Sequence, residues 1–540
     1  MQTKLPAWTN VACVVLLLAV LGLVNVYRAW TQSITYDEAV TYDAFVVGPM
    51  SHAFTGYNAN NHVLFTILAK VTTGAFGTSE LALRLPSVVA GAVYLGVLFF
   101  LCRLLFGSGA VFALAASALA LNPLILDFLS AARGYGVALA LFMVAFHQVA
   151  VILARDSSDG AARTYRWVGV SLALGGSVCA NLGFLFPAVG LGLTALMLAA
   201  FGTLGADLAS VWRFVRTTVV PLCGPGPLTA AALLVVPLRL AERYHFTYGA
   251  ARLSDTVASL VQRSVRHHLS GWPTDTLTAM VANVEAELLV PLALIALVVA
   301  TGVVATRVVR ARSLASLTLQ NRCLLLLAGT LSVTLVQLFA AHRLWDVPYP
   351  LDRTGLYFVP IFTLALALLA ENAAIWRRGS TVVRRFSIVV LCLFVSQFVT
   401  QFNVTQYAMW SYDSGSRTLY EIVARWSEPD RGTSFKIAAS LLLRPSANHY
   451  RIVNANSRIA SVSDGLAGIQ ANEFDFAVVS DWVWGDVDLM QDVGRLVCVH
   501  SASGAMLFVN RASRAAHGLD AVRRGLPPGA DCESVRRAQR

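Results

Sequence analysis

Long apolar runs alternate with short polar segments over the first 400 residues of the chain. A membrane-spanning helix needs about 20 predominantly apolar residues. The pattern predicts about eleven such spans, at residues 9–28, 85–105, 110–126, 136–154, 167–183, 185–202, 217–238, 288–306, 322–341, 355–375 and 385–402. We interpret the first span as a retained signal anchor, because Lys4 and Arg28 flank it and no clear small-residue cleavage site follows it. Residues 1–402 are therefore expected to form a polytopic α-helical membrane domain.

Two of these runs leave alternatives open. Residues 167–202 could form one long helix or a hairpin of two short helices around Asn181. We favour the hairpin, because a single crossing would move the later arginine-rich loops to the other side of the membrane. The proline-rich run at 221–227 interrupts its span, since proline removes a helix donor and clashes with the preceding turn. It is either a kink that lines a cavity or a loop between two half-spans.

Residues 403–540 lack a further span and follow a different pattern. Residues 419–426 have helical spacing, and the β-branched run at 474–480 alternates as strands do. Two short apolar segments within 495–509, joined through a Ser-Gly pair, are typical of a β-hairpin. The tail is therefore expected to be a small α/β domain.

Six of the eight cysteines lie in or beside apolar runs, where cysteine behaves as a small hydrophobe. Cys498 and Cys532 lie in the tail, which an eleven-span count places outside the cell. A disulfide between them is a reasonable expectation in that oxidising setting. The sequence has no CxxC pair and no zinc-ligand spacing.

The composition agrees with the membrane class. The chain is 56% hydrophobic and 13% charged, whereas soluble domains are about 25% charged. Its net charge is +11. If the N-terminus is cytoplasmic, basic residues gather in the cytoplasmic loops. The first outer loop, 29–84, has only Lys70 and Arg84 beside four acids. This positive-inside pattern predicts a multi-pass protein of the plasma (inner) membrane with an extracytoplasmic tail, and it explains the charge without nucleic acid.

Candidate chemistry concentrates in segments that this topology places outside. Acidic residues at a membrane surface are costly to keep and are functional hypotheses by default. The four segments are Tyr36–Ala39 with Asn60–Ser87; Asp127–Gly136; the loop 239–287 with Arg239, Arg243, His245, His267 and His268; and His342–Thr354.

These segments resemble the GT-C superfamily of membrane glycosyltransferases that use polyprenyl-phosphate sugars. The likeness is greatest to the bacterial branch related to protein O-mannosyltransferases and lipid A aminoarabinose transferases. In the first loop, His62-Val63 stands where the family more often has His-Pro-Pro. The features that carry the resemblance are the Asp37-Glu38 pair, the passage from His62 to Ser87 that ends in ALRLPS, Asn122-Pro123 leading to ARGYG, and DRT-x-x-Y-x-x-P from Asp352 to Pro360.

The resemblance implies a polyprenyl-phosphate-sugar donor in the lipid bilayer and an envelope lipid, glycan or protein as acceptor, with inversion at the anomeric carbon. The acceptor must lose a proton to a base, and Asp37 matches the family's first-loop acid. Glu38 would share that role or hold a metal or the acceptor. Arginine suits phosphate oxygens, so Arg133 and Arg353 are candidates for binding the donor phosphate. Arg343 and His342 stand behind them as further phosphate candidates, and the substrate-binding candidates are Tyr36, Asn61, His62, Asp127 and Tyr135.

Each assignment has a structural alternative. The acidic pair at 37–38 could cap a helix, since acids favour helix N-termini. Asp127 and Arg133 could form a structural ion pair, and Arg353 could anchor at the lipid headgroups. No cofactor is expected with certainty; a divalent metal is left open, although no paired metal-ligand spacing accompanies His62.

The rival function from another class is a transporter or lipid flippase. Transporters often show repeat symmetry and place polar residues at the midplane of the membrane, whereas this chain has no evident repeat and its charges gather at one surface. A membrane scaffold or sensor would not need acids and arginines in four loops. Neither GxGxxG nor GxxxxGK[ST] occurs, so a soluble nucleotide donor is unsupported.

Overall fold

The chain forms two compact units. The computed structural model describes all residues except 1–6, 57, 156–159, 204–206, 243–246, 266–274, 312, 315, 372–379, 428–434, 455–458, 463–465, 467–472, 484, 514–528 and 540. Unit 1 comprises Met1–Val26, Ala53–Ala69 and Arg84–Phe402, and unit 2 comprises Tyr27–His52, Lys70–Leu83 and Asn403–Arg540. The tail thus forms one unit with two pieces of the first loop, and the division into functional domains at 402/403 stays a prediction.

Unit 1 is helical. Its elements, some of which extend into unit 2, are α1 (Ala7–Thr31), α3 (Val63–Phe76), α4 (Glu80–Phe106), α5 (Ala110–Leu121), α6 (Pro123–Phe128), α7 (Gly134–Ala154), α8 (Gly160–Ala180), η3 (Leu182–Phe184), α9 (Leu185–Thr203), α10 (Leu208–Phe214), η4 (Val215–Val219), α11 (Val220–Cys223), α12 (Pro225–Arg239), α13 (Leu253–Val265), α14 (Asp275–Val284), η6 (Glu285–Leu289), α15 (Val290–Ala311), α16 (Leu319–Trp345), η7 (Asp352–Gly355), α17 (Phe358–Glu371) and α18 (Ser380–Thr400).

Within the described residues, each of the eleven expected spans falls mainly on helix. Eight helices within the described ranges are long and apolar enough to cross a membrane. The other three expected spans fall on α5 and α17, which are shorter, and on α8, which has 21 residues but does not reach the same hydropathy. The predicted class, a polytopic helical protein with a small C-terminal α/β part, is confirmed.

Residues 167–202 form the predicted helical hairpin. Helix α8 ends at Ala180, the backbone of Asn181 is extended, and α9 begins after the short turn η3. The Asn181 side chain accepts a hydrogen bond from Gly183 N at 2.9 Å, which closes the turn. The Leu174 side chain reaches Gly192 on the returning helix. The alternative of one long helix is therefore wrong.

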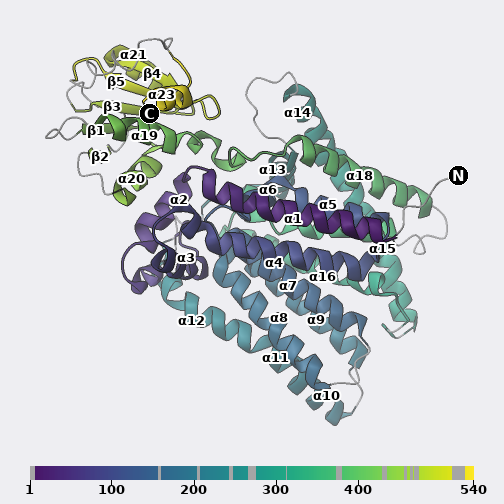
Figure 1. Cartoon of the computed structure of the whole chain (residues 1–540). Helices are drawn as coiled ribbons and strands as arrows, with labels where there is room; N and C mark the ends of the chain where they lie inside the picture. Colours follow the sequence, from purple (N-terminus) through teal and green to yellow (C-terminus); the bar gives the residue numbers. More distant parts are fainter. Residues whose placement is uncertain are drawn as a thin grey trace. The chain divides into compact units, whose positions relative to one another are not determined.

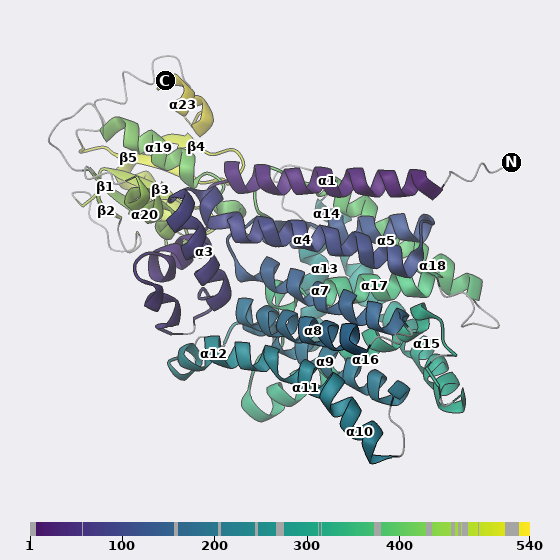
Figure 2. The same ribbon diagram turned by 60° about the horizontal axis from the view of Figure 1, so that its bottom comes forward.

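The proline-rich run at 221–227 is a kink between α11 and α12 rather than a loop between half-spans. It lies where α12 packs closely on α8, which itself lies between α7 and α12 (Figures 1 and 2). Gly226 N donates to Ser171 Oγ at 2.8 Å. A Cβ on Gly226 would lie 2.0 Å from Ser171 O, so only glycine permits this approach.

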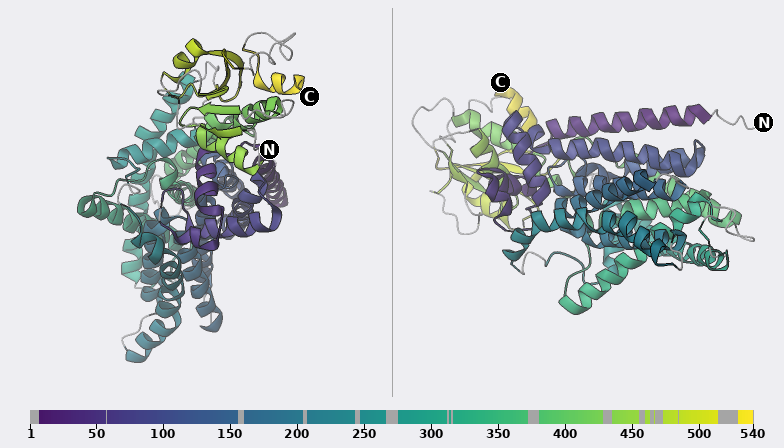
Figure 3. Two further views of the ribbon diagram at one scale, coloured as in Figure 1. Left: turned by 90° about the vertical axis from the view of Figure 1, so that its left-hand side faces the viewer. Right: turned by 90° about the horizontal axis from the view of Figure 1, so that it is seen from below.

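Unit 2 contains a five-stranded sheet with helices packed on it (Figure 3). The strand order is β2-β1-β3-β5-β4, with β1 parallel to β2 and β3, and with β5 antiparallel to β3 and β4. The elements of unit 2 and its borders are α2 (Tyr36–Thr41), η1 (Tyr42–Val46), η2 (Met50–Phe54), η9 (Ala408–Asp413), α19 (Ser416–Ser427), β1 (Phe435–Ala439), α20 (Arg444–Val453), β2 (Ile459–Val462), β3 (Phe476–Val479), α21 (Asp486–Val493), β4 (Gly494–Val499), β5 (Met506–Asn510) and α23 (Cys532–Ala538).

The predicted strand, hairpin and helix of the tail are all present as β3, β4–β5 and α19. The apolar core lies between the sheet and α21, where Met490 packs with Ala477 and Val479 of β3 and Phe508 of β5. Gly504 in the hairpin turn has φ +70°, a conformation that L side chains rarely adopt.

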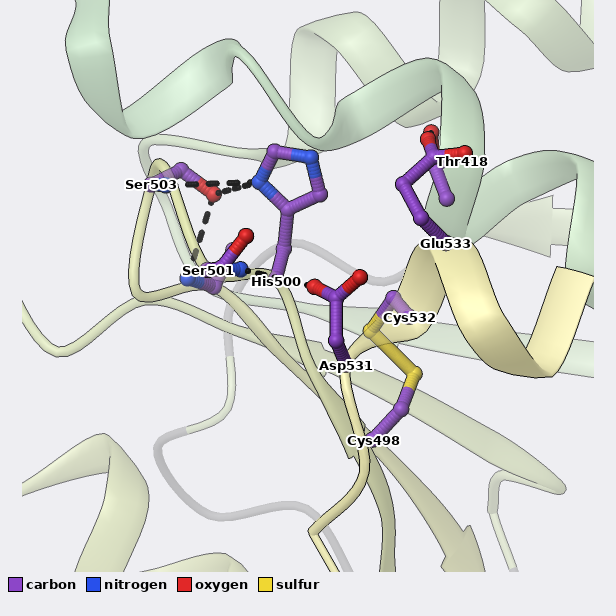
Figure 4. Close-up of a disulfide and its surroundings, with 9 residues drawn as sticks. Thr418, Cys498, His500, Ser501, Ser503, Asp531, Cys532 and Glu533 are labelled. Carbon is purple, nitrogen blue, oxygen red and sulfur yellow. Dashed lines mark hydrogen bonds between the residues drawn. A yellow bond between two sulfur atoms is a disulfide. The ribbon is translucent and has the colours of Figure 1, made fainter. Parts of the chain in front are cut away.

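The expected disulfide between Cys498 and Cys532 is also present, and it ties α23 to β4 (Figure 4). From α23, Glu533 accepts a hydrogen bond from Thr418 Oγ1 at 2.7 Å, and Arg536 pairs with Glu421 at 3.0 Å. The C-terminal helix is thereby held against α19 as well as against the sheet.

Replacing both Cys498 and Cys532 with serine is expected to destabilise unit 2. The disulfide joins residues 34 apart, and closing a loop of that length is typically worth about 2–4 kcal/mol. Thermal unfolding of the purified protein should show a lower Tm for the double variant. Cys392→Ser, which removes an exposed free cysteine, is the control and should leave Tm unchanged.

Candidate active site

Glu38 belongs to a helix cap. Helix α2 begins with a capping box in which Thr35 N donates to Glu38 Oε2 at 2.9 Å and Glu38 N donates to Thr35 Oγ1 at 3.3 Å. The sequence Thr-x-x-Glu favours this arrangement. Glu38 is fully buried. The structural alternative considered for the acidic pair thus describes Glu38, and its catalytic role stays a prediction that we do not carry forward.

Asp37 lies on the same turn but has a different environment. Its side chain is 6% exposed, and Oδ2 accepts a hydrogen bond from the indole Nε1 of Trp410 at 3.2 Å. Trp410 belongs to the tail, 373 residues away in sequence. A hydrogen bond to a carboxylate favours its ionised form, which is the form that a general base needs.

Asp413 is a third carboxylate beside this turn. It is 1% exposed, and its oxygens accept hydrogen bonds from Tyr36 N at 2.6 Å, Ser446 Oγ at 2.7 Å and Ser416 Oγ at 3.2 Å. Burial raises the pKa of Asp413 to about 8; the three donors oppose that shift, and the Asp37 charge adds to it. Tyr36, a predicted substrate-binding residue, contributes its backbone N–H to this contact.

In unit 1, Arg133 is a fully buried cation at the start of α7. Its guanidinium donates to Asn60 Oδ1 at 2.7 Å and to the carbonyl of Ala59 at 3.0 Å, and its own carbonyl accepts from Ser87 Oγ at 3.3 Å. Arg133 therefore joins the first loop and α4 to the start of α7. Its predicted ion pair with Asp127 stays a prediction.

His62 and Tyr135 form an aromatic pair next to Arg133. Their ring centroids are 5.1 Å apart at an interplanar angle of 72°, and Asn181 Nδ2 lies 3.4 Å from His62 Nδ1. Burial lowers the pKa of His62 well below its usual value, and the charges of Arg133 and Arg353 lower it further, so the ring is neutral at physiological pH. Its Nε2 is buried and has no hydrogen-bond partner among the described residues.

Asp352 and Arg353 contact residues of the third candidate segment, the loop 239–287. Asp352, with φ +48°, accepts from Arg263 Nε and from Arg263 Nη2, both at 3.2 Å, and from the hydroxyl of Tyr248 at 3.3 Å. The Arg353 guanidinium lies 5.1 Å from the centroid of the Tyr248 ring. Burial raises the pKa of Tyr248 to about 12. The charge of Arg353 also lowers the pKa of His62, so the residues around Asp352 and those around Arg133 form one cluster in unit 1.

Two predicted substrate-binding residues have structural contacts. The Asn61 amide donates to the carbonyls of Ala53 and Gly56 and accepts from Thr66 Oγ1, so it shapes its own loop. Asp127 is buried near the end of α6, and its carbonyl accepts from the N–H groups that close the turn toward α7. Substrate contacts by either residue stay predictions.

The other two phosphate candidates lie at the C-terminal end of α16. His342 packs on Tyr349 with ring centroids 4.4 Å apart, and the Tyr349 backbone pairs with Ala250, two residues from Tyr248. Arg343 is exposed, and its guanidinium lies 5.9 Å from the Phe339 ring centroid. His342 is thus connected to the cluster through Tyr349, and Arg343 has an aromatic contact on its own helix.

An apolar cavity of about 170 Å³ lies beside the cluster in unit 1. Helix α13 contributes to both, because Leu260 and Ser264 line the cavity and Arg263 pairs with Asp352. The remaining lining comes mainly from α15, α16, α17 and α18. An apolar space therefore adjoins a group of arginines.

No three His, Cys, Asp or Glu side chains gather as a metal site would require, within the part of the chain that the structure describes. Arg243, His245, His267 and His268, noted in the third segment, lie outside the described residues. Arg239 lies in the last turn of α12.

Sequence reasoning assigned no role to four residues of these clusters: Tyr248, Arg263, Trp410 and Asp413. Arg263 lies on the amphipathic segment 253–265, whose helical periodicity could have been noticed. The tail segment 410–413 resembles the family in sequence, but local pattern does not reveal the contacts of Trp410 and Asp413, because their partners are more than 370 positions away.

Comparison with known proteins finds similarity among solved structures. No family model and no curated protein matches the chain. ArnT from Cupriavidus metallidurans in the apo state has a TM-score of 0.46 and 13% identity, over 93% of this chain and 99% of that one. The Archaeoglobus fulgidus oligosaccharyltransferase complex with Zn and sulfate has a TM-score of 0.42 and 12% identity, over 91% and 73%. The mycobacterial arabinofuranosyltransferase AftD has a TM-score of 0.41 and 13% identity, over 92% and 40%.

Every one of these TM-scores is below 0.5 and every identity is below 25%. The function of this chain is therefore argued from its own residues.

The raised pKa of Asp413 predicts a pH dependence of stability. An unfolded aspartate loses its proton near pH 4, whereas the folded one keeps it to about pH 8. Between these values the folded state binds more protons, so the stability of unit 2 should fall as pH rises from about 4 to 8 and then level off. Asp413→Asn, which does not titrate, should remove that part of the dependence.

Thermal unfolding of the wild type and of Asp413→Asn between pH 5 and pH 9 measures this difference. Equal pH profiles for the two proteins would mean that Asp413 titrates normally in the folded state.

Proposed function

We propose that this protein is a membrane glycosyltransferase. It moves a sugar from a polyprenyl-phosphate donor to a lipid, glycan or protein acceptor at the outer face of the cell membrane, with inversion at the anomeric carbon. The buried acid Asp37 acts as the base, and the arginine cluster of unit 1 binds the donor phosphate.

The observation that carries the proposal is the apolar cavity next to the arginine cluster. A polyprenyl phosphate needs an apolar surface for its chain and fixed cations for its head, and α13 borders both. Arg353 has the planar guanidinium that suits phosphate oxygens, and its cation–π contact with Tyr248 holds it over that ring. Arg263 forms an ion pair with Asp352, so it supports the cluster rather than binding phosphate by itself.

The reaction follows from these groups. The acceptor hydroxyl or amine attacks the anomeric carbon, its proton passes to the Asp37 carboxylate, and a new glycosidic bond forms. The bond between the anomeric carbon and the phosphate oxygen breaks, and its electron pair leaves with the lipid phosphate. Negative charge grows on that phosphate as the bond breaks, and fixed cations stabilise it. His62, which is neutral, can hydrogen-bond to the sugar through Nε2 without adding charge.

The alternative hypothesis, a transporter or lipid flippase, has less support. Asp37 lies in the first turn of a capped helix, and its carboxylate accepts a hydrogen bond from an indole N–H. It is therefore a fixed group rather than one that moves with a substrate through the membrane. The arginines are likewise anchored by loop carbonyls, an aspartate and an aromatic ring.

Asp37→Asn is expected to lower sugar transfer by about 100- to 10,000-fold, because it removes the base. Glu38→Gln is the matched control on the same turn. Glutamine can replace glutamate in a capping box, so this variant should retain transfer within about threefold. The measurement is transfer of radiolabelled sugar from polyprenyl-phosphate donors in membranes, with folding checked by thermal unfolding.

Equal transfer by wild type and Asp37→Asn would remove Asp37 from the chemistry. Loss in Glu38→Gln with a folded protein would move the base to Glu38. No transfer by the wild type from any polyprenyl-phosphate donor would contradict the proposed function and favour transport.

Arg353→Gln is expected to lower kcat/KM for the donor by about 10- to 1,000-fold, because the leaving phosphate loses a cation. Arg353→Lys keeps the charge but loses the planar fork, so its loss should be intermediate. The same substitution at the exposed Arg343 should cost less than Arg353→Gln. Equal losses at 343 and 353 would argue that neither arginine has the specific role assigned to Arg353.

A further inference from the structure

The first part of the tail forms a strap along the end of α1. We define the strap as residues 403–415. It runs beside the residues that lead into α2. Three side chains, one from the last turn of α1 and two from the residues just after it, donate hydrogen bonds to its carbonyls. These bonds are Arg28 to Gln406 O at 3.3 Å, Gln32 to Val404 O at 3.0 Å and Ser33 to Ser414 O at 2.8 Å.

The strap then contacts the acid turn, which we define as residues 35–38 at the start of α2, at two points. Trp410 Nε1 donates to Asp37 Oδ2 at 3.2 Å, and Asp413 Oδ2 accepts from Tyr36 N at 2.6 Å. The 3₁₀ segment η9 is broken at Trp410, where φ is −130° and ψ is +39°. The side chains of Trp410 and Asp413 are almost fully buried, at 2% and 1% exposure. Two consecutive residues of the acid turn, 36 and 37, are thus held by one short piece of the tail.

The strap is itself anchored to the tail's helices. Asp413 accepts hydrogen bonds from Ser416 at the start of α19 and from Ser446 of α20. A second contact lies alongside, where Tyr450 of α20 accepts from Ile34 N at 2.8 Å and donates to Glu80 at 3.0 Å. The position of the acid turn is therefore fixed by folded elements of the tail.

We infer that Trp410 and Asp413 are positioning residues for the catalytic acid, so that the tail completes the acid site. Trp410 orients the Asp37 carboxylate directly, and Asp413 holds the backbone of the turn through Tyr36 N. This inference rests on the proposed function, in which Asp37 is the base.

The physical reason is geometric. Catalysis by a carboxylate requires its oxygen within hydrogen-bond reach of the proton that it accepts, and small displacements are costly. Helix α2 has only six residues, and a helix that short is not stable by itself. An indole N–H fixes the carboxylate orientation and favours its ionised form.

The first test is Trp410→Phe, which keeps an aromatic ring and removes the N–H donor. A hydrogen bond to a charged group supports a loss of about tenfold or more in kcat, with the KM for the donor unchanged. Trp426→Phe is the matched control, because Trp426 stacks on Phe476 in the sheet of the same unit. This control should retain kcat.

A double-variant cycle decides whether Trp410 acts through Asp37. In the Asp37→Asn background, Trp410→Phe should change the residual transfer by less than about twofold, because the carboxylate that it orients is gone. A further loss as large as in the wild-type background would overturn the inference for Trp410.

The second test asks whether Asp413 acts through the hydrogen bond that it accepts from Tyr36 N. Asp413→Ala removes the acceptor for Tyr36 N and should lower kcat by about tenfold or more. Asp413→Asn can still accept from Tyr36 N and should restore kcat to within about threefold. Asp475→Ala is the control, since Asp475 likewise accepts from a backbone N–H, of Lys436, and from the Ser513 hydroxyl, but within the sheet region.

The outcomes distinguish this inference from the proposed function. If the wild type transfers sugar and Asp37→Asn does not, yet Trp410→Phe and Asp413→Ala match their controls, the positioning role is wrong and the proposed function stands. Failure of Asp413→Asn to restore kcat in a folded protein would also contradict positioning through the hydrogen bond. Absence of wild-type transfer would overturn both proposals.

Discussion

The cost of burying carboxylates governs the region around α2. Asp37, Glu38 and Asp413 are exposed by 6%, 0% and 1%. A buried ionisable group is tolerated only when hydrogen bonds replace its water. The donors here come from two distant parts of the chain, since Thr35 and Tyr36 supply backbone N–H groups and the tail supplies an indole and two hydroxyls. The first loop and the tail therefore satisfy these carboxylates together.

Local pattern was sufficient for much of the fold. Apolar runs predicted the eight described helices that are long and apolar enough to cross a membrane, and the Ser-Gly turn predicted the β4–β5 hairpin, where Gly504 has a positive φ. The capping box at Thr35 to Glu38 is also a local signal, and it accounts for the hydrogen bonds between Glu38 and Thr35. The contact between Asp37 and Trp410 is different in kind, because no periodicity or spacing links residues 373 positions apart.

The motifs that support the family resemblance have a physical reason in unit 1. A Cβ on Gly134 would lie 2.0 Å from Ala180 O and 2.7 Å from His62 Cβ, and a Cβ on Gly136 would lie 2.1 Å from Phe128 O. The two glycines of ARGYG therefore let the start of α7 pack against the end of α8 and the end of α6. That packing brings Arg133, His62 and Tyr135 together, so the glycines matter for the site although they carry no chemistry.

The tail, viewed from sequence, looks like a domain appended to a membrane enzyme. The hydrogen bonds of unit 2 support a different interpretation, because the six residues of α2 cannot fix their own orientation. The strap holds the turn at Tyr36 and Asp37, and Ser446 anchors the strap to α20. Unit 2 therefore contains segments from both sides of the predicted boundary at 402/403. The carboxylate that we propose as the base owes its geometry to residues on both sides of that boundary.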